Sequence, residues 1–143
     1  MGEERMPAKD LYHKAVCAAL IKDGWTITHD PLTLRYHKRD IYIDLGAERL
    51  LAAERDSQKI AVEIKSFIAN SALAALEEAV GQYIVYQDVL EEMQKERILY
   101  LAVPDYAQDG ILSEPIGELL IRKHNIRLMV YQPDTEEVVA WKP

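Results

Sequence analysis

The chain has 143 residues, 49% of them hydrophobic, and a formal net charge of −7 at pH 7 with a pI near 5.1. This length and composition predict one domain that buries its own core. No stretch is long and apolar enough for a membrane span or a signal peptide, so we expect a cytoplasmic protein. The acidic balance excludes the global positive field that drives nonspecific nucleic-acid binding. The single cysteine, Cys17, has no partner for an internal disulfide and is expected to be a small buried hydrophobe.

The first half of the chain predicts one helix and three strands. Apolar residues at helical spacing indicate a helix over residues 8–22, which Asp23-Gly24 ends. Strands are expected near residues 25–36, 40–54 and 59–67, with turn signals at Asp30-Pro31 and at residues 55–58. The buried face of the helix is expected to carry Leu11, Ala15, Val16, Ala19 and Leu20.

The second half predicts two helices and three strands. Asn70-Ser71 can cap a helix that runs to about Met93, and residues 97–103 form the continuous apolar run of a strand covered on both faces. Ser113-Glu-Pro opens a helix that ends near residues 124–125, and residues 126–131 and 137–141 close the chain as a hairpin. The order predicts one α/β sandwich around a mixed sheet, with the third and fourth strands parallel and joined by a right-handed crossover.

Glu63 and Lys65 carry the strongest chemical signal. They lie two residues apart in the β-branched run of residues 59–65, so both side chains project from the same face of a strand. A carboxylate there can take a hard divalent cation, and a neighbouring lysine can orient or activate a water. The pair therefore indicates metal-assisted hydrolysis of a phosphodiester. An isolated E-x-K is more often the solvated face of an amphipathic strand, so its context decides its meaning.

A second carboxylate can come from Asp44 or Glu48 on the preceding strand. If a hairpin closes at residues 55–58, Glu48 lies nearer to the E-x-K, and Asp44 lies roughly 13 Å further along a straight strand. Gly46 offers a bulge or bend that would bring Asp44 back. The residues alone leave both open, and the candidate metal ligands are Asp44, Glu63 and Glu48.

The order of elements, with E-x-K on the third strand, resembles the PD-(D/E)XK nuclease superfamily. Gln82 and Tyr86 also fit the Q-x-x-x-Y found after the E-x-K in some of its branches. This resemblance implies a restriction-endonuclease-like α-β-β-β-α-β core with a mixed sheet between helices, plus an added helix and a C-terminal hairpin. That superfamily usually places an aspartate on the second strand, which favours Asp44 over Glu48, although Ile43 stands where its eponymous proline would be.

The same resemblance implies a set of roles at this site. Mg²⁺ or Mn²⁺ is the expected cofactor, held by Asp44 and Glu63. Lys65 would position the attacking water, and Gln82 would hydrogen-bond a carboxylate or a phosphate. His13, on the first helix, is a further candidate, near where some members carry an additional ligand.

Longer shared segments make the chain similar to the XisH family from Met6 onward. These cyanobacterial proteins are named as controlling factors for excision of the fdxN element, a developmentally programmed rearrangement in heterocyst formation that also involves a site-specific recombinase and a small factor, XisI. The resemblance implies one domain over residues 6–143, with residues 1–5 as an N-terminal extension. The shared segments are Met6-Pro-Ala-Lys-Asp10, Lys22-Asp-Gly-Trp-Thr-Ile-Thr28, Asp30-Pro-Leu32, Asp44-Leu-Gly-Ala-Glu48, Ile60-Ala-Val-Glu-Ile-Lys-Ser-Phe67 and Gly81-Gln-Tyr83.

Three functions fit these observations: a Mg²⁺-dependent DNA endonuclease, a noncatalytic accessory factor that binds DNA or XisI and the recombinase, and a protein-only scaffold. Only weak nonspecific DNA affinity is expected from so acidic a chain. A homodimer or a complex with XisI is expected through the C-terminal hairpin, with Tyr131 and Trp141 exposed beside Val138 and Val139 at a sheet edge. The candidate phosphate contacts form two basic clusters, Arg35, His37, Lys38 and Arg39, and Arg122, Lys123, His124 and Arg127.

Overall fold

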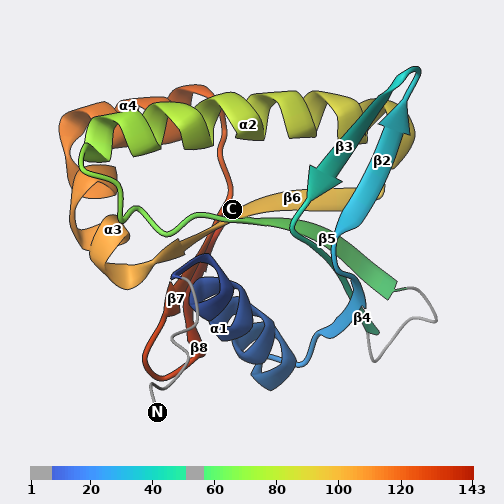
Figure 1. Ribbon diagram of the computed structural model, residues 1–143, viewed down its shortest axis with the longest axis horizontal. Coiled ribbons are helices and arrows are strands. Elements are labelled where there is room, and N and C mark those ends of the chain that lie inside the picture. The colour runs from blue at the N-terminus through green and yellow to red at the C-terminus, as the bar shows by residue number, and fades with distance from the viewer. Residues whose placement is uncertain (1–7, 51–56) are drawn as a thin grey trace, which may run out of the picture.

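The computed structural model describes residues 8–50 and 57–143 (Figure 1). Its elements, in chain order, are α1 (Ala8–Lys22), β1 (Thr26–His29), β2 (Leu32–Tyr36), β3 (Arg39–Ile43), β4 (Leu45–Leu50), β5 (Ser57–Ile64), α2 (Ala72–Met93), β6 (Arg97–Pro104), α3 (Asp105–Asp109), the 3₁₀ turn η1 (Ile111–Ser113), α4 (Pro115–Lys123), β7 (Leu128–Gln132) and β8 (Glu137–Lys142). No helix in this part of the chain is long and apolar enough to cross a membrane.

A six-stranded mixed sheet forms the middle layer, in the order β1-β4-β5-β6-β7-β8. The pairs β5–β6 and β6–β7 are parallel, and the remaining pairs are antiparallel. Helix α2 lies on one side of this sheet and α1 on the other (Figure 1). The predicted parallel pairing of the two strands that flank the long helix is confirmed. The predicted mixed α/β fold class is confirmed as well.

Alternation along β5 divides the core into two layers. Ile60 and Val62 are fully buried in the cluster that includes Val16 and Leu20 of α1. Ala61, between them, faces the opposite cluster, which α2 covers. A strand covered on both faces is hydrophobic along most of its length, so a charged residue within it needs a specific environment.

Two long strands expected from the sequence are each broken into two. The first breaks at Asp30-Pro31, where the chain leaves the main sheet after β1 and β2 of the separate hairpin begins. The second breaks at Asp44, between β3 and β4. The reason is packing: β2 and β3 form a separate hairpin whose Leu32, Leu34 and Ile43 are buried in the α2 layer. Residues 51–54 of the expected second strand lie outside the described residues.

Other boundaries agree more closely. The Ser71 side chain accepts a hydrogen bond from the Ala74 N–H at 3.1 Å and so caps α2, which ends at Met93 as expected. Strand β5 begins at Ser57 and ends at Ile64, three residues earlier than expected. The sequence reading missed α3 and η1, which are too short to show helical periodicity.

Two exposure predictions are wrong. Leu11 is 53% exposed, not on the buried face of α1. Tyr131 is fully buried rather than exposed, because its ring packs edge-on against Tyr12 of α1, with centroids 6.4 Å apart. Trp141 is half-buried and lies against Trp25. Val139 does remain exposed on β8, the last strand of the sheet.

Candidate functional site

The β4–β5 ladder places Asp44 beside Glu63. Leu45 pairs with Val62, so the residue before β4 stands opposite the residue after Val62. The expectation that Glu48 would lie nearer to the E-x-K is therefore wrong. The ladder pairs Leu50 with Ser57, so residues 51–56 join the strands and the connection is centred three residues earlier than the turn assumed at 55–58. The Asp44 carboxylate therefore lies beside Glu63 without any bend at Gly46.

Glu48 points to a different partner. It stands opposite Lys59 in the ladder, and its Oε1 lies 4.0 Å from Lys59 Nζ. The structure thus brings Asp44 and Glu63 together and leaves Glu48 in a partly exposed ion pair further along β4.

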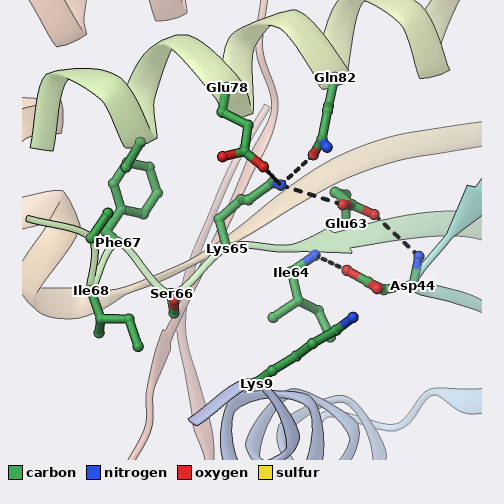
Figure 2. Close-up of a pocket in the computed structure, with 12 residues that line it drawn as sticks. Lys9, Asp44, Glu63, Ile64, Lys65, Ser66, Phe67, Ile68, Glu78 and Gln82 are labelled. Atoms are coloured by element: carbon green, nitrogen blue, oxygen red, sulfur yellow. Dashed lines mark hydrogen bonds and ion pairs between the residues drawn. The ribbon is translucent and has the colours of Figure 1, made fainter. Parts of the chain in front are cut away.

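Each of the two paired carboxylates is fixed by the backbone of the other strand. The Asp44 N–H donates to Glu63 Oε1 at 3.2 Å, and the Ile64 N–H donates to Asp44 Oδ2 at 2.8 Å (Figure 2). Asp44 can accept this bond because it lies in the break between β3 and β4, where its side chain takes the place of a ladder partner for Ile64. The arrangement holds two acidic side chains where β4 begins and β5 ends, in the interior of the sheet.

Glu63 is only 6% exposed, and its titration reflects this burial. Loss of solvation and, next, the neighbouring Asp44 carboxylate raise the pKa of Glu63, Lys65 partly offsets both, and the net pKa is about 8. At neutral pH the Glu63 carboxyl is therefore mostly protonated. A divalent cation between two such oxygens would displace the proton and remove the repulsion, so the donor set fits a hard cation such as Mg²⁺.

Lys65 projects to the same side as Glu63 and meets the α2 helix. Its Nζ lies 3.6 Å from Glu63 Oε2 and 3.7 Å from Glu78 Oε1, and it donates a hydrogen bond to Gln82 Oε1 (Figure 2). The sequence placed Gln82 near the site, and its side chain contacts Lys65 rather than a carboxylate. Glu78 was missed, although it lies one helical turn before Gln82 on the same face.

These side chains border an open cavity of about 430 Å³. Lys9 of α1 reaches its lower rim, opposite the α2 residues (Figure 2). Nothing in the sequence pattern pointed to Lys9, because its position depends on how α1 packs against the sheet. Two carboxylates beside two lysines suit a metal-bound phosphate: the carboxylates hold the cation, and the ammonium groups attract phosphate oxygens.

Comparison with known proteins agrees with this fold. The family model for the XisH protein matches residues 6–139. The crystal structure of an XisH family protein from Nostoc punctiforme PCC 73102 has 35% sequence identity and a TM-score of 0.85, covering 94% of this chain and 100% of that chain. A structure described as a fdxN element excision controlling factor protein from Anabaena variabilis gives 35% identity and a TM-score of 0.84, with 94% and 99% covered. Among curated proteins, no sequence matches significantly. On the extent of these matches, the chain belongs to the XisH family.

Proposed function

We propose that this protein acts in the excision of a DNA element and that its site hydrolyses phosphodiesters with Mg²⁺ or Mn²⁺. The observation that carries the proposal is the convergence of Asp44 and Glu63, each hydrogen-bonded to the other's strand, with Lys65 on the same face. The role in excision rests on the relative from Anabaena variabilis, which is described as a controlling factor for excision of the fdxN element.

The side chains have distinct roles in this proposal. Asp44 and Glu63 hold the cation, with the Ile64 carbonyl available on the same edge of β5 as the N–H that binds Asp44. The bound metal supplies Lewis-acid activation of a phosphoryl oxygen. Lys65 orients the attacking water and stabilises the charge that develops at phosphorus. Gln82 holds the Lys65 ammonium in place from α2.

Topology supports placing the chain in the PD-(D/E)XK superfamily. Helix α1 is followed by three antiparallel strands, β1, β4 and β5, then by α2 and the parallel strand β6. With the β2–β3 hairpin treated as an insertion, this is the α-β-β-β-α-β order. Asp44 then precedes the second strand of that core and Glu63 lies on the third.

Metal-dependent thermal stability tests the proposal directly. Wild type should melt at a higher temperature in millimolar Mn²⁺ or Mg²⁺, because the cation binds only the folded state. Glu63→Gln should lose most of this rise, together with any cleavage of duplex, branched or single-stranded DNA. Glu48→Gln is the matched control, since it removes a carboxylate from the same sheet but away from the site. Full metal stabilisation in Glu63→Gln would contradict the metal site.

A noncatalytic accessory factor is the second candidate, and one observation favours it. β8 ends the sheet and exposes Val139 to 58%, which leaves an edge open to a second copy, an XisI-like small protein or a site-specific recombinase. Sedimentation with and without an XisI-like protein, comparing wild type with Val139→Lys, measures this association. A monomer at tens of micromolar that is unchanged by the added protein would count against it.

Salt dependence separates a DNA-binding role from a scaffold role. A DNA binder loses affinity as salt rises, because each phosphate contact releases counterions. In the first basic cluster, Arg35 Nη1 is already paired with Asp40 Oδ1 at 3.2 Å, so we expect a shallow slope. No DNA affinity at low salt would favour the scaffold.

A further inference from the structure

Three potential metal ligands of mixed chemistry meet below the sheet, apart from the Asp44–Glu63 pair. His13 and Cys17 are four residues apart on α1, so they share one face of that helix. Asp30 follows the last residue of β1. His13 Nε2 lies 2.9 Å from one carboxylate oxygen of Asp30 and 3.0 Å from the other.

The Cys17 sulfur completes this group. One ligand atom from each of the three residues, an imidazole nitrogen, a thiol sulfur and a carboxylate oxygen, lies within 4.8 Å of the other two. Ligand atoms around a tetrahedral zinc ion are roughly 3.5 Å apart, given bonds of about 2.0–2.3 Å. The His13 and Asp30 atoms, 2.9 Å apart, are already closer than this, and the Cys17 sulfur lies within 4.8 Å of both, so a bound ion would open the first pair slightly and draw the sulfur in.

We propose that His13, Cys17 and Asp30 form a binding site for a transition-metal ion of the zinc class. Sulfur, nitrogen and carboxylate oxygen are the donors that Zn²⁺ takes in proteins, whereas Mg²⁺ takes oxygen donors almost alone. The site thus differs in chemistry from the two-carboxylate pair, and it does not depend on the nuclease proposal. Three protein ligands leave a fourth tetrahedral position for water or another small ligand.

The surroundings give an ion access and room. The His13 side chain is 31% exposed and that of Asp30 is 48% exposed, so an ion can enter from solvent. His13 also borders a cavity of about 170 Å³, which Lys9 and Asp44 line as well. A bound ion would tie α1 to the connection between β1 and β2.

The test uses the full chain and the fact that Cys17 is its single cysteine. Any thiolate-to-metal charge-transfer band must then come from one side chain. Chelator-treated protein is titrated with Co²⁺ in a non-thiol reductant and excess Mg²⁺, which competes for oxygen-donor sites such as the Asp44–Glu63 pair. We expect a near-ultraviolet charge-transfer band with the visible bands of four-coordinate Co²⁺, saturating at one ion per chain and erased by stoichiometric Zn²⁺.

Variants assign the ligands. Cys17→Ser should abolish the charge-transfer band, and His13→Gln and Asp30→Asn should each weaken Co²⁺ binding at least about tenfold. His124→Gln, at the exposed end of α4, is the matched histidine control and should bind as wild type does. His13 and Asp30 are partly exposed, so these variants should fold even if the change at Cys17 does not, and circular dichroism without metal checks this.

Three results would overturn the inference. One is the absence of a thiolate band in millimolar Co²⁺, which would leave His13 and Asp30 as a hydrogen-bonded pair only. Another is a band of undiminished affinity in both His13→Gln and Asp30→Asn. Co²⁺ uptake that lacks the band and disappears in Glu63→Gln would also refute it, because the ion would then sit at the carboxylate pair, and the proposed function would stand. The charge-transfer band could instead survive in Glu63→Gln while Mg²⁺ fails to stabilise wild type. That pair of results would refute the proposed function and leave the zinc-class site standing.

Discussion

Replacing Glu63 by Gln should change how stability depends on pH. In the folded protein burial, reinforced by Asp44, raises the pKa of Glu63 from 4.5 to about 8. An acid whose pKa rises on folding stabilises the folded state while it is protonated. Its contribution is complete below pH 4.5 and is lost as the pH rises through about 8. The metal-free wild type should therefore become less stable across this window because of Glu63.

The structure sets the size of the effect. At about 1.4 kcal/mol for each pH unit between the two pKa values, the ceiling is about 5 kcal/mol. Because the cavity admits water, which screens the charge, we expect about 2–3 kcal/mol. Glutamine copies the protonated carboxyl: its amide oxygen can accept the Asp44 N–H bond that Glu63 Oε1 accepts at 3.2 Å. Glu63→Gln should match wild type near pH 5 and exceed it by about 2–3 kcal/mol at pH 8.5.

Urea unfolding followed by circular dichroism, with chelator present and at several pH values from 5 to 9, measures the difference. Glu48→Gln is the control: its partly exposed carboxylate pairs with Lys59, and it should follow the wild-type pH profile to within about 0.5 kcal/mol. Parallel profiles for wild type and Glu63→Gln would refute the argument that burial and Asp44 perturb this carboxyl.

Two further predictions concern the lysine and the packing of α4. Lys65→Met removes a cation beside Glu63, so the Mn²⁺-induced rise in melting temperature should persist or grow while DNA cleavage disappears; loss of that rise would instead make Lys65 part of the metal site. Gly117→Ala should destabilise the fold by about 1–3 kcal/mol in urea, because the added Cβ would collide with the Ile111 carbonyl oxygen and lie 2.7 Å from Leu112 Cα. Gly81→Ala is the control in α2, where an added Cβ meets nothing within 4 Å, and it should stabilise the folded state by about 0.5–1 kcal/mol. Equal effects of the two substitutions on stability would contradict the packing described.

The sequence predicted those features of the site that depend on local periodicity. Glu63 and Lys65 are two residues apart, and period-two alternation puts them on the α2 side of β5, opposite Ile60 and Val62. The partner of Glu63 was harder to place, because the ladder register depends on where in the sequence the connection between the strands is centred. Placing the turn at residues 55–58, when the connection spans residues 51–56, centred it three residues too late and moved the expected partner of Glu63 from Asp44 to Leu50.

Other contacts depend on tertiary packing and leave no local signal. Lys9 and Glu78 reach the cavity only because α1 and α2 lie on opposite sides of the same strand end. Tyr131 was expected at the surface because it closes a C-terminal strand, yet α1 covers it. A single sequence contains the spacing within an element but not the angle at which two elements pack.

The reciprocal bonds between Asp44 and Ile64 and between Asp44 and Glu63 have a consequence for protein engineering. An E-x-K grafted onto a continuous hairpin of another protein would find the facing main-chain groups already engaged by their neighbours. The acceptor scaffold would need an interrupted strand, so that one aspartate can turn its side chain onto the opposing backbone. A designer who wishes to transplant this pair of carboxylates should therefore copy the gap in the sheet first and the acidic residues second.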